Sequence, residues 1–107
     1  MSQKKLKEDC EKIKKLNHSF YYVPNTSTET QLDITITQIA LDKLVEDSFL
    51  LKVFVPVYQH GSDYEFFEDL SNPKKENIDI SECQDPKDYR PLTIYDLDFV
   101  IAYKRIT

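Results

Sequence analysis

The stretch that decides the fold is residues 49–70, FLLKVFVPVYQHGSDYEFFEDL. Residues 49–59 are apolar at both odd and even positions, which is expected of a strand that is covered on both sides. Pro56 modifies this prediction, because proline cannot donate to a strand ladder and favours an edge or a bulge. A His-Gly-Ser-Asp turn signal follows, and residues 64–70 again resemble a strand. We therefore expect a β-hairpin with Gly61, the only glycine, at its tip.

The N-terminal part of the chain, residues 1–17, is predicted to be an amphipathic helix. Leu6, Cys10, Ile13 and Leu16 follow one another at steps of four, three and three, so they form one stripe that can pack. The other positions hold lysines and carboxylates at four-residue spacing, which suits a solvated helix face. We expect Cys10 to be a small core residue of this stripe.

The polar segment that follows the helix is predicted to be a short strand and a loop. Residues 19–23 are aromatic and β-prone, and they end at Pro24. Residues 25–30 consist of Asn, Thr, Ser and Glu, a composition typical of a loop.

Residues 31–37 carry the clearest alternation in the chain. Leu32, Ile34 and Ile36 alternate with polar residues, which predicts a strand with one face in water. Residues 38–47 fit two interpretations, a continuation of the strand through a bulge or a short helix. We favour the short helix.

The second half of the chain is predicted to be a long excursion and a closing strand. Residues 71–91 are rich in Asn, Pro, Lys, Glu, Asp and Ser, with one short strand expected at 78–80. Residues 97–106 alternate as a buried strand. The expected fold class is α+β, with the N-terminal helix packed on a mainly antiparallel sheet of four to five strands and a second short helix. With 107 residues, the chain is expected to form a single domain over residues 1–107.

Composition excludes several enzyme classes. A chain with one glycine cannot form a glycine-rich phosphate loop or a nucleophile elbow. His18, His60, Cys10 and Cys83 lie at intervals that do not suit a metal site, and carboxylates beside Cys83 oppose thiolate formation. We expect no enzymatic activity, no metal and no cofactor. The absence of an apolar signal core and of a run of roughly 20 apolar residues predicts a cytoplasmic protein without a membrane segment.

Charge is unevenly distributed. Residues 1–15 contain six lysines against three carboxylates, whereas the remainder contains eight basic and sixteen acidic residues. Because an acidic body repels phosphate, binding to nucleic acid is not expected outside the lysine-rich helix.

The predicted interaction site combines the second strand of the hairpin with the acidic loop after it. If Tyr64, Phe66 and Leu70 face the core, then Phe67 faces outward between carboxylates, a composition that protein interfaces favour. The alternative is that Phe67 is covered by the helix or by residues 71–91. The candidate interaction residues are His60, Asp63, Glu65, Phe67, Asp69, Glu82, Asp85 and Asp88.

Three functions are compatible with these patterns. The leading hypothesis is a non-catalytic acidic protein-binding module, of the inhibitor, immunity-protein or phage accessory type, whose partner is a protein with a basic surface. The alternative is a structural or assembly subunit that pairs through an edge strand, for example as a homodimer. The third is a small enzyme or ligand-binding domain with a pocket lined by Phe20, Tyr22, Tyr58 and Tyr103.

Overall fold

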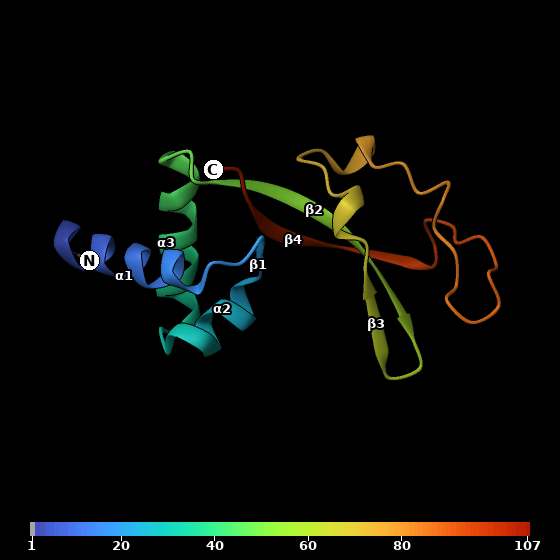
Figure 1. Cartoon of the computed structure of the whole chain (residues 1–107), viewed down its shortest axis with the longest axis horizontal. Coiled ribbons are helices and arrows are strands. Elements are labelled where there is room, and N and C mark those ends of the chain that lie inside the picture. Colours follow the sequence, from blue (N-terminus) through green and yellow to red (C-terminus); the bar gives the residue numbers. More distant parts are fainter. Residues whose placement is uncertain (1) are drawn as a thin grey trace. The chain divides into compact units, whose positions relative to one another are not determined.

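A computed structural model describes residues 2–107 and has the expected α+β architecture (Figure 1). The chain divides into two compact units, which share strands β2 and β4. The helical unit comprises the chain up to Lys52 together with Ala102–Thr107, and the loop unit comprises Val53–Ile101. That residues 1–107 form a single domain stays a prediction. In chain order the elements are α1 (Gln3–Leu16), β1 (Phe20–Tyr21), α2 (Val23–Thr30), α3 (Ile34–Glu46), β2 (Leu50–His60), β3 (Asp63–Phe66), the 3-10 helices η1 (Glu68–Leu70) and η2 (Lys75–Asn77), and β4 (Leu97–Arg105).

Helix α1 confirms the predicted amphipathic helix. The Ser2 hydroxyl caps it by accepting a hydrogen bond from the Lys5 amide at 3.1 Å, and Asn17 ends it in the left-handed conformation. Cys10 and Ile13 are buried, as the stripe requires. Asp9 is also fully buried on this helix, where its carboxylate forms an ion pair with the ammonium group of Lys5 at 3.3 Å.

Helix α2 replaces the loop that was predicted for residues 25–30. Pro24 lies in the first turn, where the missing amide hydrogen costs nothing because that amide would have no helical partner. The Thr28 and Thr30 hydroxyls donate to the carbonyls of Pro24 and Thr26, four residues earlier. The composition therefore suits a short helix whose hydroxyl groups are satisfied by its own backbone.

Helix α3 shows that the strand predicted at residues 31–37 was wrong. Asp33 caps this helix, because its carboxylate accepts a hydrogen bond from the Ile36 amide at 2.8 Å. The buried positions Thr37, Ala40, Leu41 and Leu44 follow helical spacing, and Ile34 is exposed. The short helix favoured for residues 38–47 is confirmed as the second part of α3.

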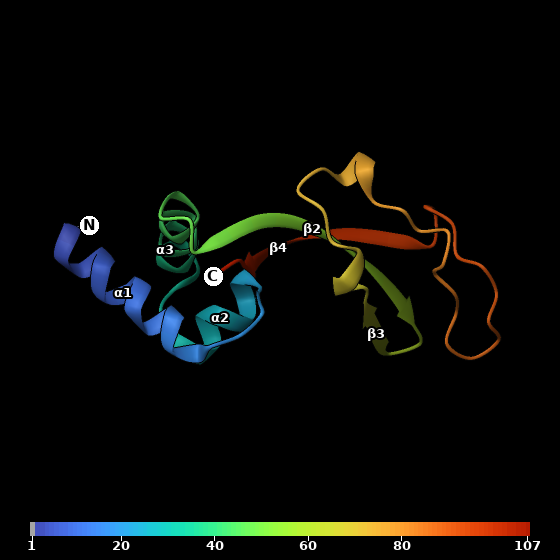
Figure 2. The same cartoon turned by 45° about the horizontal axis from the view of Figure 1, so that its top comes forward.

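The core of the helical unit joins α1, α3 and the ends of three strands. Figures 1 and 2 show α1, α2 and α3 gathered around the start of β2 and the end of β4. The Tyr103 hydroxyl donates to the Asp42 carboxylate at 2.9 Å, and burial raises the pKa of Tyr103 to about 12. The buried cluster consists of Cys10, Ile13, Tyr21, Ala40, Leu41, Leu44, Leu50 and Tyr103.

The four strands form one sheet in the order β1-β4-β2-β3. β1 pairs antiparallel with β4, and β2 pairs antiparallel with β3 in a hairpin. Gly61 occupies the hairpin tip with a φ of 65°, which is the conformation that favours glycine. The predicted hairpin is thus confirmed, although β3 ends at Phe66 and does not reach Leu70. The closing strand predicted at residues 97–106 corresponds to β4.

The rest of the loop unit is a long segment that connects η1 to β4 (Figure 2). It begins beside β2, where Phe54 and Asn72 exchange backbone hydrogen bonds of 2.8 and 3.2 Å. The strand predicted at 78–80 is absent from this segment, which is described throughout. Ile80 instead packs its side chain against a buried cluster of Tyr58, Cys83, Leu92 and Leu97.

Candidate protein-interaction surface

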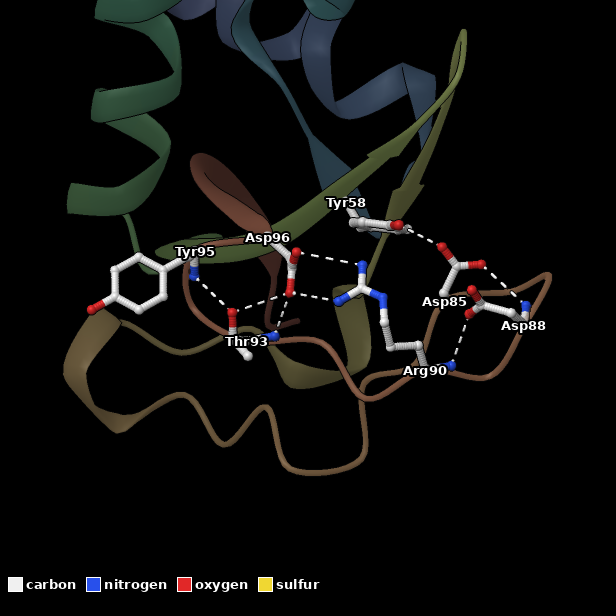
Figure 3. A network of polar contacts seen from close by, with 7 residues as sticks. All are labelled: Tyr58, Asp85, Asp88, Arg90, Thr93, Tyr95 and Asp96. Carbon is white, nitrogen blue, oxygen red and sulfur yellow. Dashed lines mark hydrogen bonds and ion pairs between the residues drawn. The ribbon is translucent and has the colours of Figure 1, made fainter.

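Hydrogen bonds fix a turn of the loop unit between residues 84 and 92. The Tyr58 hydroxyl, from β2, donates to Asp85 Oδ2 at 2.5 Å (Figure 3). Asp85 Oδ1 accepts from the backbone amides of Lys87 and Asp88 at 2.8 and 3.3 Å. These donors lower the pKa of Asp85, with the tyrosine hydrogen bond as the main cause, and the same bond raises the pKa of Tyr58. The turn is therefore tied to the sheet by an ionised, almost buried carboxylate.

A second polar cluster fixes residues 90–96. The Thr93 amide donates to Asp96 Oδ2 at 2.8 Å, and the Arg90 guanidinium forms an ion pair with the same carboxylate at 3.3 Å (Figure 3). The Thr93 amide and the guanidinium both lower the pKa of Asp96. The Thr93 hydroxyl accepts a hydrogen bond from the Tyr95 amide at 3.2 Å. The backbone of residues 93–96 is consequently held in one conformation.

Large side chains point outward from this fixed backbone. Tyr95 is 93% exposed, Tyr89 is 70% exposed and Ile94 is 60% exposed. Tyr89 also adopts a φ of 59°, which is uncommon for a bulky residue. Figure 3 shows the Tyr95 ring directed away from the Asp96 carboxylate. Exposed aromatic residues on a fixed loop are typical of a protein-binding surface.

An apolar groove lies next to Ile94 and Tyr95, within the loop unit. It has a volume of about 510 Å³. One wall comes from the segment at η2 and the other from the residues that enter β4. Lys75 and Glu76 supply its charged residues, and the Lys75 ammonium lies 5.1 Å from the centroid of the Phe99 ring. The apolar lining consists of Ile78, Ile80, Ile94, Tyr95, Leu97 and Phe99.

Of the eight predicted interaction residues, five are exposed and three are not. Asp63, Glu65, Asp69, Glu82 and Asp88 are exposed, and the hairpin register places Asp63 opposite His60. His60 itself is half-buried, and its ring stacks on Tyr58 at 5.7 Å.

Two of the predicted residues, Phe67 and Asp85, are not exposed as the predicted interaction site requires. Phe67 is half-buried and packs against the cluster around Tyr58, whereas Tyr64 and Phe66 are exposed. The outward orientation of Phe67 is therefore wrong, and the alternative that residues 71–91 cover it is confirmed, because Cys83 of that segment belongs to the cluster against which Phe67 packs. Asp85 is buried as the acceptor for Tyr58 and does not belong to the exposed surface.

The sequence interpretation missed Tyr89, Ile94 and Tyr95. One signal for the last two was available, since Thr93 and Asp96 have the spacing at which short polar side chains bond to nearby backbone amides. That spacing indicates an ordered turn whose intervening residues point outward. No comparable signal identifies Tyr89.

The two cysteines are not activated as nucleophiles. Burial raises the pKa of Cys83, and the carboxylates of Asp69 and Asp79 raise it further. Burial likewise raises the pKa of Cys10, whose thiol contacts the Ala40 carbonyl at 3.6 Å. Both side chains therefore fit a structural role.

The helical unit offers a second surface, which is chemically different. Three residues join α2 to α3, a connection length found in helix-turn-helix motifs. In such motifs the second helix contacts base edges, with cationic side chains on the phosphates. The exposed positions of α3 include Ile34, Thr35, Ile39, Asp42 and Glu46, and its one cation, Lys43, is paired with Asp47 at 3.3 Å. This chemistry does not suit a nucleic-acid groove.

No family model, no curated protein and no solved structure matches the chain. Across residues 2–107, no helix combines the length and apolar character required to cross a membrane. Within the same residues, no three His, Cys, Asp or Glu side chains are grouped as a metal site.

Proposed function

We propose that this chain is a non-catalytic protein-binding module, of the inhibitor, immunity-protein or accessory type, that uses the loop unit to bind a basic protein. The observation that carries the proposal is the fixed display of exposed apolar side chains, Tyr89, Ile94 and Tyr95, on a strongly acidic unit. A backbone that is fixed before binding loses little further conformational entropy in a complex, so ordering of the loop takes little from the affinity.

The charge distribution supports a basic partner. The loop unit contains eleven acidic and four basic residues, whereas the helical unit contains eight acidic and ten basic residues. Two of the four cations in the loop unit are already engaged, Arg90 with Asp96 and Lys75 over the Phe99 ring. An acidic surface of this kind increases the association rate with a basic protein and disfavours acidic competitors.

Matched charge variants test this proposal. Glu65→Gln with Glu82→Gln neutralises two exposed carboxylates of the loop unit, and Glu8→Gln with Glu46→Gln does the same in the helical unit. Both double variants have the same net charge. Binding partners captured from native lysate are quantified at low and at moderate salt for each variant.

We expect the loop-unit variant to retain severalfold less of a basic partner at low salt, with the helical-unit variant within about a factor of two of the parent. Equal losses for both variants, or capture of no partner at either salt concentration, would contradict the proposal.

A second function, assembly through an edge strand, is favoured by β3. This strand lies at one edge of the sheet, and its Tyr64 and Phe66 side chains are exposed. Such edges pair with other chains unless charges block them. Sedimentation velocity across a range of concentrations tests this function. Dimers that Tyr64→Lys abolishes would support it, and a monomer at every concentration would count against it.

A further inference from the structure

The groove beside Ile94 and Tyr95 combines features that hydrophobic docking grooves require. It is concave, its lining is mainly apolar, and one of its walls is the part of the loop that polar contacts hold in place. Ile94 and Tyr95 are exposed although they adjoin a cavity into which apolar side chains could pack. Nothing in the hydrogen bonding of the 93–96 turn requires a large apolar residue at either position.

The segments that form the groove carry a small net acidic charge, because Lys74 and Lys75 are outnumbered by Glu76, Asp79 and the exposed Asp98. Glu76 lies in its lining, and Asp79 lies between the lining residues Ile78 and Ile80. Asp79 is exposed, and the hydrogen bond from the Ser81 amide lowers the pKa of its carboxyl, so this carboxylate is ionised at neutral pH. The nearest cation, Lys75, is directed at the Phe99 ring. A partner segment therefore gains from apolar anchors in the groove and from cations beside them.

We infer that this groove binds a basic amphipathic helix of a partner protein, with two or three large apolar side chains inserted between η2 and the start of β4. The inference rests on the proposed function and assigns it a site and a ligand chemistry. A helix with apolar residues at positions i, i+3, i+4 and i+7 presents its anchors along one line, which suits a groove between two chain segments. Lysines or arginines on its flanks would face Glu76 and Asp79.

A second copy of this chain fits the groove less well than a separate partner. The basic segment that a copy would offer is α1, with its six lysines in residues 1–15. The apolar stripe of α1 is already packed, because Cys10 and Ile13 are buried in the core of its own helical unit. This helix would supply cations without apolar anchors.

The test uses a synthetic peptide of roughly 15 residues, made of leucine and lysine with the leucines on one helix face. A control peptide of the same composition distributes its leucines around the helix. Binding to the full-length protein is measured by fluorescence anisotropy at low and moderate salt and mapped by ¹⁵N NMR shifts. The variants are Ile94→Ala with Tyr95→Ala, and the control Ile101→Ala, whose side chain is exposed in the same unit away from the groove lining.

We expect the amphipathic peptide to bind more tightly than its control, with shifts concentrated in residues 75–80 and 94–99. The Ile94/Tyr95 double variant should raise Kd at least about tenfold, and Ile101→Ala should leave it within about twofold. NMR spectra of the variants report whether each one retains the fold.

Two results would overturn the inference and leave the proposed function standing: equal affinity for both peptides, which indicates charge attraction alone, or shifts concentrated in β3. Absence of peptide binding would also overturn it, as would salt-sensitive self-association that Ile94→Ala with Tyr95→Ala removes. Failure of the proposed function is recognised separately, by native capture that does not respond to Glu65→Gln with Glu82→Gln.

Discussion

Different interactions stabilise the interior of the helical unit and the interior of the loop unit. The helical unit has a buried cluster of eight residues from α1, α3 and the strands, whereas the loop unit has a cluster of four and, besides it, the buried residues Val53, Val55 and Val57 of β2. The loop unit compensates with side-chain hydrogen bonds to backbone amides, such as those that Asp85 and Asp96 accept. Regular packing makes a scaffold, and polar turns make a surface whose outward residues can vary. This difference associates stability with the helical unit and, under the proposed function, binding with the loop unit.

The largest expected effect compares one leucine from each buried cluster. Leu41→Ala should reduce the free energy of unfolding by about 3–5 kcal/mol, because Leu41 is fully buried among helices that cannot close the cavity. Leu92→Ala should cost about 2–3 kcal/mol, since the loop around it can adjust. Urea unfolding followed by circular dichroism measures both. A larger loss for Leu92→Ala would reverse the assigned roles.

The next effect concerns the turn that Asp85 holds. Asp85→Ala removes the acceptor for the Tyr58 hydroxyl and two backbone amides, so this turn should open more often. We expect tryptic cleavage after Lys87 to become about tenfold faster. Cleavage after Lys75 serves as the internal reference, and Gln84→Ala is the matched control because its side chain is exposed. Unchanged cleavage after Lys87 would show that Asp85 does not fix the turn.

Low pH should destabilise the loop unit before it destabilises the helical unit. The three carboxyls whose pKa values are lowered, Asp79, Asp85 and Asp96, all belong to the loop unit. Because the pKa in the folded state lies below the unfolded value of about 3.9, their stabilising contribution is complete above about pH 5 and is lost as the pH falls through 3.9 toward the lower folded values. Amide NMR signals of residues 84–96 should therefore weaken before those of α3. Simultaneous loss would contradict this order.

High pH should destabilise both units, so it distinguishes their stabilities less clearly than low pH does. The pKa values of Tyr58 in the loop unit and Tyr103 in the helical unit are both raised, the latter to about 12. Each neutral tyrosine contributes stability below about pH 10, which is lost as the pH rises toward the folded pKa.

The smallest expected effect concerns the hairpin tip. Gly61→Ala should cost about 1 kcal/mol, because alanine is strained at a φ of 65° although its Cβ would meet no atom within 4 Å. Gly61→Asn should cost less, since asparagine tolerates this conformation. Thermal unfolding measures both variants. Equal costs would indicate that side-chain packing, and not backbone strain, determines the residue at the tip.

Features with a local signal were predictable from the sequence. The amphipathic stripe gave α1, and the turn residues between two apolar runs gave the β2–β3 hairpin with its glycine. Helix α2 and the first residues of α3, 34–37, were hidden because they mimic other elements. Thr-rich α2 resembles a loop until its hydroxyls find backbone acceptors, and the alternation of Leu32, Ile34 and Ile36 imitates a strand until the Asp33 cap starts a helix.

The interaction surface was only partly predictable, because it depends on tertiary contacts. Charge alone indicated an acidic half of the chain, but burial of Phe67 and exposure of Tyr64 depend on how the loop packs beside the hairpin. The role of Asp85 depends on a tyrosine 27 residues away in sequence. The burial of Asp9 in a lysine-rich helix had no signal at all.

Site-specific photo-crosslinking in the native host tests most directly whether binding belongs to the loop unit. Benzoylphenylalanine replaces Tyr95 in the loop unit or Ile39 in α3, both exposed positions. We predict that position 95 crosslinks to a basic protein, identified by mass spectrometry, and that position 39 does not. A partner crosslinked through position 39 and never through position 95 would contradict the assignment and place binding on the helical unit.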